Sequence, residues 1–149
     1  MDDTGSFAKQ SRHMRIMALD HGTRRIGVAV CDELKIFATP LEYIPADDME
    51  KVIERLRQLI REKEVELILV GMPRNMDGTL GQAAEKVNAF IAALQPAITT
   101  PIKKWDERLT SVMANRTLIE GNVRRADRKE KVDMMAAAIL LQSYLDAQG

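Results

Sequence analysis

The stretch ALDHGTRRIGVAV, residues 18–30, decides how the fold begins. An apolar run ends at Asp20, a turn containing Gly22 follows, and a second apolar run starts beyond two arginines. Residues 15–19 and 26–31 are short and mostly apolar, which predicts two antiparallel strands joined by this turn. Asp20 is then either an ordinary turn residue or a carboxylate held at a sheet end for chemistry.

The segments that follow predict a mixed sheet covered by helices. Pro40 within a third apolar run indicates an edge position or a bulge, because proline cannot donate to a strand ladder. Later segments alternate between helical and strand periodicity, which is typical of βαβ units. The expected strands are 15–19, 26–31, 36–44, 65–70 and 101–105, and the expected helices are 47–63, 80–94, 109–120 and 131–146.

Bulk composition excludes several classes of protein. The chain has 149 residues with 22 basic and 22 acidic side chains, so attraction to nucleic acid requires local basic patches. The single cysteine, Cys31, excludes an internal disulfide, and its place in an apolar run predicts a small core residue. With only two histidines in the chain, we do not expect a zinc site. Without a signal core or an apolar span, we expect a cytoplasmic protein with no membrane partner.

The domain organisation expected from the sequence is simple. Residues 1–14 lack periodicity and predict a disordered leader or extension. The remainder, residues 15–149, predicts a single domain without an internal repeat or a linker.

Acidic residues interrupt or adjoin apolar segments at three places. Asp20 ends the first strand, Asp106 and Glu107 follow the fifth, and Asp133 opens the last helix. Taken singly, each has an ordinary reading as a turn residue, a cap or a complement to a helix dipole. Parallel strands one and five would share a carboxyl edge, however, and the last helix could cross that edge.

Carboxylates that converge there would form a site for Mg²⁺ or Mn²⁺, since hard ions prefer oxygen ligands. Two such ions about 4 Å apart would suit phosphodiester cleavage by activating water and stabilising the leaving oxygen.

The loop GMPRNMDGT, residues 71–79, offers Arg74 and Asn75 at the same edge. Its amides and side chains could bind phosphate, or the loop could be only a tight strand-to-helix turn capped by Thr79. It is not a P-loop, because it lacks the Gly-Lys-Ser/Thr sequence.

Basic residues cluster in NVRRADRKEK, residues 122–131, which has five basic and two acidic side chains. The cluster could neutralise phosphates together with Arg24, Arg25, Lys103, Lys104 and Arg108, although charged loops are often merely solvated. His21 could touch substrate but is more simply a turn side chain. The candidate nucleic-acid-binding residues are Thr23, Arg24, Arg74, Asn75, Arg108, Arg124, Arg125, Lys129 and Lys131.

Four motifs in order, LDHGTRRIGVAVCD, GMPRNMDGT, DERLTS and KVDMMAAAILL, resemble the YqgF (RuvX-like) family over about residues 15–146. Members have an RNase H-like fold and are described as Holliday junction resolvases or pre-16S rRNA nucleases. The resemblance implies an α/β fold with a five-stranded mixed sheet in the order 3-2-1-4-5.

The same resemblance implies a metal-dependent nuclease with Asp20, Glu107 and Asp133 as its acidic triad and Asp106 in support. Many relatives in the wider fold group carry an acid on the first helix or after strand four. Here strand four ends in Gly71-Met72-Pro73, so the second carboxylate is expected from strand five.

Three functions remain open at this point. The first is an endonuclease acting on a structured RNA, such as an rRNA precursor, or on branched DNA. Resolving a DNA junction would require a dimer. The sequence shows no clear dimer face and fits a monomer or weak homodimer. The second is a nucleotide-binding ATPase or kinase, since DHGTRRIGVAV also resembles the phosphate loop of the actin and sugar-kinase group. The third is a non-catalytic nucleic-acid-binding module.

Overall fold

A computed structural model describes residues 14–22, 24–73, 81–107 and 128–148, with the backbone alone for residues 128–134. The predicted leader up to residue 13 and the predicted helix over 109–120 lie outside these residues. The elements are β1 (Arg15–His21), β2 (Arg25–Cys31), β3 (Ala38–Pro45), α2 (Met49–Glu62), β4 (Val65–Met72), α3 (Gln82–Leu94), β5 (Ile102–Asp106) and α5 (Arg128–Gln148).

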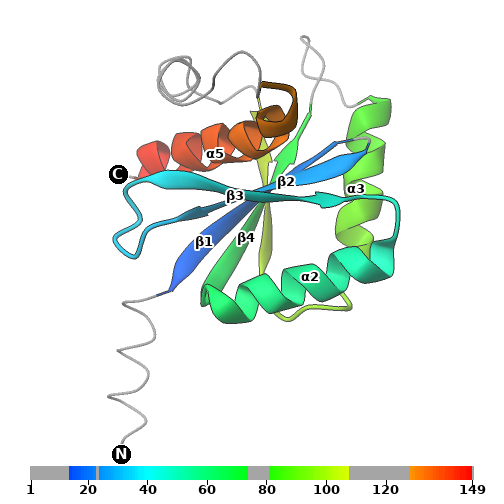
Figure 1. Cartoon of the computed structure of the whole chain (residues 1–149), viewed down its shortest axis with the longest axis horizontal. Coiled ribbons are helices and arrows are strands. Elements are labelled where there is room, and N and C mark those ends of the chain that lie inside the picture. Colours follow the sequence, from blue (N-terminus) through cyan, green and yellow to red (C-terminus); the bar gives the residue numbers. More distant parts are fainter. Residues whose placement is uncertain (1–13, 23, 74–80, 108–127, 149) are drawn as a thin grey trace, which may run out of the picture.

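The five strands form one mixed sheet in the order β3-β2-β1-β4-β5 (Figure 1), which confirms the predicted order. β1 pairs antiparallel with β2 and parallel with β4, and β4 pairs parallel with β5. The carboxyl ends of β1, β4 and β5 therefore reach the same edge of the sheet.

The turn between β1 and β2 requires glycine at position 22. The Gly22 amide donates to the Arg25 carbonyl at 3.0 Å, which closes the hairpin. A Cβ atom at position 22 would lie 2.7 Å from that same carbonyl oxygen, too close for any side chain. Thr23, the next residue of the turn, lies outside the described residues.

Pro40 lies where the sequence predicts both an edge and a bulge. β3 is an outer strand, and its pairing with β2 shifts between Val28, opposite Glu42, and Ala29, opposite Pro40. The shift places the proline at an irregularity of the ladder, where a missing amide donor costs least.

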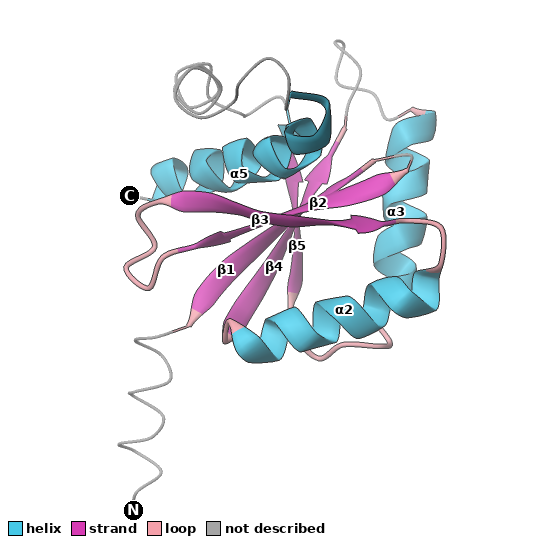
Figure 2. Cartoon of the chain, viewed as in Figure 1, coloured by secondary structure: helices cyan, strands magenta, loops and turns pink. Residues whose placement is uncertain are grey.

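Helices cover both faces of the sheet (Figure 2). On one face, Met17 and Leu19 of β1 belong to the core that contains α2 and α3 side chains. On the other face, Ile16 and Ala18 pack in the core formed with α5. Side chains alternate along a strand, so the next even position, Asp20, belongs to the α5 face.

The core also confirms the assignment of Cys31 as a small buried residue. Its side chain is 2% exposed, and its Sγ accepts the Ile16 amide at 3.2 Å. Burial raises the pKa of the Cys31 thiol, so the sulfur remains a neutral packing group.

Among the helices of the described ranges, none is long and apolar enough to span a membrane.

The loop between β2 and β3 is tightly ordered and tied to α5. Asp32 Oδ1 accepts the amides of Ile36 and Phe37 at 2.7 and 3.0 Å, and Lys35 adopts a left-handed φ of 59°. Gln142 of α5 accepts the Ala38 amide and donates to the Ile36 carbonyl, both at 2.9 Å. The last helix thus holds the loop at the sheet end opposite Asp20.

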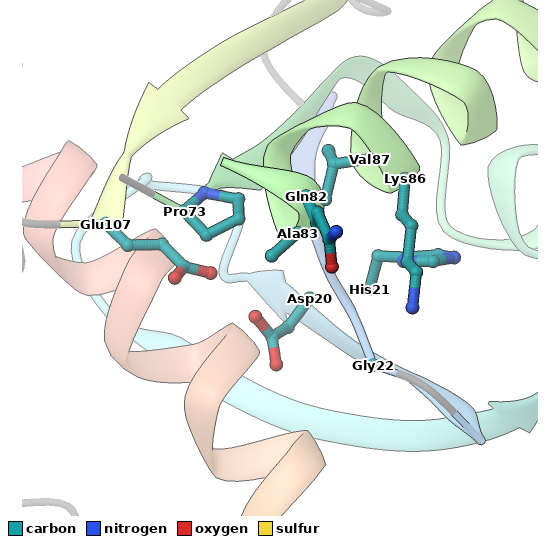
Figure 3. Close-up of a pocket in the computed structure, with 9 residues that line it drawn as sticks. All are labelled: Asp20, His21, Gly22, Pro73, Gln82, Ala83, Lys86, Val87 and Glu107. Carbon is teal, nitrogen blue, oxygen red and sulfur yellow. The ribbon is translucent and has the colours of Figure 1, made fainter. Parts of the chain in front are cut away.

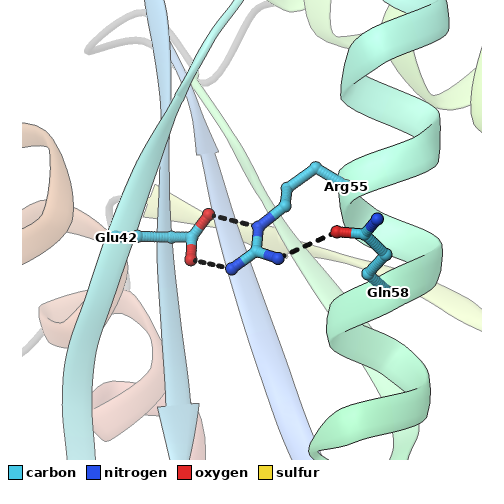
Figure 4. A network of polar contacts seen from close by, with 3 residues as sticks. All are labelled: Glu42, Arg55 and Gln58. Carbon is cyan, nitrogen blue, oxygen red and sulfur yellow. Dashed lines mark hydrogen bonds and ion pairs between the residues drawn. The ribbon is translucent and has the colours of Figure 1, made fainter.

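A polar network joins α2 to the edge strand β3 (Figure 4). Arg55 donates to both carboxylate oxygens of Glu42, at 2.9 and 2.7 Å, and to Gln58 Oε1 at 2.9 Å. Hydrogen bonding to Glu42 raises the pKa of the Arg55 guanidinium. The geometry is bidentate, which distinguishes this contact from an ordinary surface ion pair.

We predict a measurable coupling energy between Glu42 and Arg55. Their side chains are 28% and 37% exposed, so solvent screening limits the coupling to about 0.5–1 kcal/mol. Urea unfolding of Glu42→Gln, Arg55→Met and the double variant measures it directly. Additive losses of stability in the double variant would show that the two side chains act independently.

Candidate active site

Asp20 lies near the carboxyl end of β1, opposite Gly27 of β2. Leu19 is level with Val70 of β4, so Asp20 follows one residue later, beside the position of Gly71. The strand continues through His21, which makes Asp20 part of the sheet edge rather than the turn itself. The hairpin ladder fixes its position.

Glu107 follows β5 directly, and its side chain lies over Gly71 of the neighbouring strand. Asp106 is level with Met72, and Trp105 is level with Gly71. A Cβ atom on Gly71 would lie 2.8 Å from Glu107 Oε1, 3.1 Å from Leu140 Cδ2 and 3.3 Å from Glu107 Cγ. The absence of a side chain at position 71 therefore gives the Glu107 carboxylate its space between β4 and α5.

Asp20 and Glu107 line one pocket of about 480 Å³ at this edge. Figure 3 shows both carboxylates directed into the same space. The structure thus brings together two of the three acids predicted to meet. Asp106, the neighbouring acid, ends β5 and is absent from the residues that line this pocket.

The opposite wall of the pocket comes from α3, none of whose residues is among the predicted site residues. Its first two turns contribute polar and apolar side chains, namely Gln82, Ala83, Lys86 and Val87. In the sequence these residues read only as part of an amphipathic helix. The order of the elements could have predicted this wall, because a helix that follows the loop after β4 begins at the edge where the parallel strands end.

His21 is the last residue of β1 and packs against α3, which corrects its interpretation as a turn side chain. Its ring lies 4.7 Å from the Phe90 ring, at an interplanar angle of 36°. Burial lowers the pKa of His21, and the positive charge of Lys86 lowers it further. The imidazole is therefore neutral at neutral pH and contributes a polar but uncharged surface to the pocket.

Three of the predicted basic residues with described side chains lie away from this pocket. Arg25 sits over the Tyr43 ring at 5.1 Å, and Lys103 Nζ sits over the Tyr144 ring at 5.0 Å. Lys104 is exposed on the outer strand β5. None of the three is among the residues that line the pocket.

The remaining candidates lie at the hairpin turn, on α5 or outside the described residues. Arg24 is exposed at the hairpin turn. Asp133, Lys129 and Lys131 lie on α5 within the part described by backbone alone. Outside the described residues are Thr23, Arg74, Asn75, Arg108, Arg124 and Arg125. Within the described part of the chain, no group of three His, Cys, Asp or Glu side chains could hold a metal.

The sheet order and the flanking helices define the RNase H-like fold. Thermus thermophilus RuvC in complex with a Holliday junction substrate superimposes with a TM-score of 0.54 at 14% identity, covering 91% of this chain and 96% of that one. The Fowlpox virus Holliday junction resolvase superimposes with a TM-score of 0.54, also at 14% identity, covering 90% and 99%. These likenesses establish the fold.

The sequence identifies the family within that fold. The sequence model of the RuvX family, described as Holliday junction resolvase, matches residues 14–147. A protein of Desulforamulus reducens named "Putative pre-16S rRNA nuclease" is 53% identical over 134 residues, 90% of this chain and 98% of that protein. One of the same name from Halothermothrix orenii is 52% identical, covering 91% and 96%. The chain belongs to the RuvX family, which confirms the resemblance found in its motifs.

We predict that Gly71→Ala displaces the Glu107 side chain. Because the closest atom, Glu107 Oε1, is the end of a flexible side chain that can move aside, the stability cost should lie at the low end of the range of about 1–3 kcal/mol for overpacking. Because a displacement of about 1 Å in an active site can cost about a hundredfold in rate, nuclease activity should fall far more than the folded fraction. Urea unfolding and the fluorescence of Trp105, the single tryptophan, monitor the fold beside the substitution.

The control is the same substitution in a Glu107→Ala background. Without the Glu107 carboxylate, the new methyl group loses its closest neighbour and retains only the contact with Leu140. The stability cost of Gly71→Ala should therefore be smaller in that background. An equal cost in both backgrounds would contradict the assigned clash.

Proposed function

We propose that this protein is a metal-dependent endonuclease that hydrolyses phosphodiester bonds in structured nucleic acid, and that its substrate is the 5′ end of the 16S rRNA precursor. The observation that carries the proposal is the meeting of Asp20 and Glu107 in one pocket at the carboxyl edge of the sheet. The names of relatives at about 50% identity support the RNA substrate.

The residues of the pocket fit a divalent cation. Asp20 and Glu107 present oxygen donors, which Mg²⁺ and Mn²⁺ prefer, and Gly71 provides the space in which the Glu107 carboxylate lies. When bound by these two residues, Mg²⁺ or Mn²⁺ would provide the chemistry needed for water activation and for charge stabilisation on the leaving oxygen. Asp20 and Glu107 are accordingly the proposed ligands, with Asp106 in a supporting position.

Asp133 is the proposed third ligand because of its position on α5. It precedes Ala137 by four residues and Leu140 by seven, and both of these are buried in the core between α5 and the sheet. Residues three, four and seven apart share a helix face. The helical period therefore supports a position for residue 133 on the face of α5 that packs against the sheet.

In this mechanism the protein binds and orients the phosphodiester while the carboxylates fix the reacting centre. Holding the reacting groups in line removes much of the entropic barrier to hydrolysis. We expect the basic residues among the proposed contacts to neutralise neighbouring phosphates and the polar ones to hydrogen-bond to them, which would position the strand without reading its sequence. The proposed contacts are Thr23, Arg24, Arg74, Asn75, Arg108, Arg124, Arg125, Lys129 and Lys131.

Asp20→Asn, Glu107→Gln and Asp133→Asn should each abolish cleavage of a 16S rRNA precursor fragment in Mg²⁺ or Mn²⁺. Each amide keeps the size of the side chain but removes its charge, so the unfolding midpoint should change little. Cleavage is followed by gel electrophoresis, and stability by thermal unfolding of the same preparations.

Glu54→Gln is the matched control, since Glu54 is an exposed carboxylate on α2 and does not line the pocket. It should cleave at the wild-type rate. Full metal-dependent turnover by purified Asp20→Asn would exclude this pocket as the active site.

Resolution of a Holliday junction is the second candidate, favoured by the description of the RuvX family. A junction is resolved by two cuts related by a dyad, so this function requires two active sites in one assembly. A monomer in solution at micromolar concentration would therefore favour RNA processing.

The two substrates can be compared directly. We expect the wild-type protein, with Mg²⁺ or Mn²⁺, to cleave the rRNA precursor fragment faster than a four-way DNA junction of equal concentration. Symmetric paired cuts in the junction, with no cleavage of the RNA, would reverse the assignment. Sedimentation under the same conditions supplies the oligomeric state.

A further inference from the structure

The pocket beside Asp20 and Glu107 has two walls of opposite charge. The acidic wall consists of the two carboxylates at the ends of β1 and β5. Across the space, Lys86 projects from α3 beside His21 (Figure 3). Among the described residues, Lys86 is the only lysine or arginine that lines the pocket.

Neither burial nor an ion pair with a described residue explains the presence of Lys86 at this position. Its side chain is exposed on the second turn of α3, and among the described residues no carboxylate forms an ion pair with it. By comparison, Arg55 is held by Glu42, and Lys103 is held over the Tyr144 ring. The Lys86 side chain is therefore accessible to a ligand in the pocket.

Gln82 lies one turn before Lys86 on the same side of α3 and lines the same pocket. A spacing of four residues corresponds to a rise of about 6 Å along a helix, so the two side chains form a short polar row beside the pocket. Ala83 and Val87 supply apolar surface next to this row. The wall thus combines a charged group, an amide and apolar surface.

We propose that Lys86 binds a phosphate group next to the scissile one, with Gln82 donating to the same stretch of the strand. This inference rests on the proposed nuclease function and adds a substrate-binding wall to the pocket. A phosphodiester strand that approaches two carboxylates is repelled by them, and a cation on the facing helix offsets this repulsion. The strand would pass between α3 and the acidic wall.

Lys86→Met tests the proposal, because methionine keeps much of the apolar stem and removes the charge. With the 16S rRNA precursor fragment, we expect KM to rise about five- to tenfold, which lies within the range for one hydrogen bond of ordinary net strength. The value of kcat should stay within about twofold of wild type, because uniform binding is lost. Lys86→Arg should restore most of the lost affinity.

The salt dependence gives a readout that a purely structural role would not change. Loss of one phosphate contact should reduce the slope of log affinity against log salt by about 0.7–0.9. The slope is measured by fluorescence anisotropy of the labelled RNA fragment without divalent metal, so it does not depend on cleavage. Lys51→Met on α2, an exposed lysine outside the pocket, is the matched control and should keep the wild-type slope.

The outcomes separate this inference from the proposed function. If wild type cleaves the RNA and Lys86→Met matches it in KM and salt slope, the role of Lys86 is excluded and the nuclease assignment stands. If wild type cleaves neither RNA nor junction, the nuclease assignment fails; a reduced slope for Lys86→Met in the anisotropy measurement would then still support the binding wall. An equal fall for Lys51→Met would overturn it.

Discussion

The parallel pairing of β4 with both β1 and β5 is the constraint on which the site depends. Adjacent strands lie about 4.8 Å apart, so the backbones of β1 and β5 are separated by about 10 Å with β4 between them. A carboxylate at the end of β1 and one after β5 can share one space only by reaching across the end of β4. At the level of that crossing β4 has Gly71, and a side chain there would fill the space that Glu107 occupies.

Alternation along β1 explains why two adjacent residues have different surroundings. Asp20 belongs to the α5 face, where Ala18 is buried, whereas His21 packs against Phe90 of α3. The pocket lies at the end of the sheet, so it is open to residues from both faces. The carboxylate therefore lies on the α5 face of the sheet, whereas the imidazole lies on the α3 face beside Lys86.

Much of this arrangement follows from the sequence because it depends on local rules. Apolar runs and turn residues predict the strands, Pro40 predicts an irregular edge, and the shared carboxyl edge predicts the meeting of Asp20 with Glu107. Sequence boundaries were less accurate: β4 continues to Met72, and α5 begins at Arg128 rather than at residue 131.

The α3 wall and the role of Gly71 did not follow from the sequence. A lysine on an amphipathic helix reads as a solvated side chain, and only the packing of α3 beside β1 places Lys86 at the pocket. In the sequence, Gly71 resembles an ordinary turn residue. Its contact with Glu107 is not apparent there, because the two residues are 36 positions apart and meet only through the register of β4 and β5. Such contacts are properties of the assembled sheet rather than of any short window of sequence.

The hydrogen bonds that Gln142 makes to the β2–β3 loop affect the order in which the parts of the fold can form during synthesis. Strands β1, β2 and β3 come from the first third of the chain, yet one of their faces is covered by α5, the last of the described elements. Gln142 completes hydrogen bonds with residues 36 and 38, more than a hundred positions earlier. The apolar face of the early hairpins therefore stays uncovered until the final helix leaves the ribosome, and contacts of such long sequence separation form slowly. A partly made chain that lacks α5 also lacks Asp133, so the three proposed ligands can come together only after α5 has been synthesised.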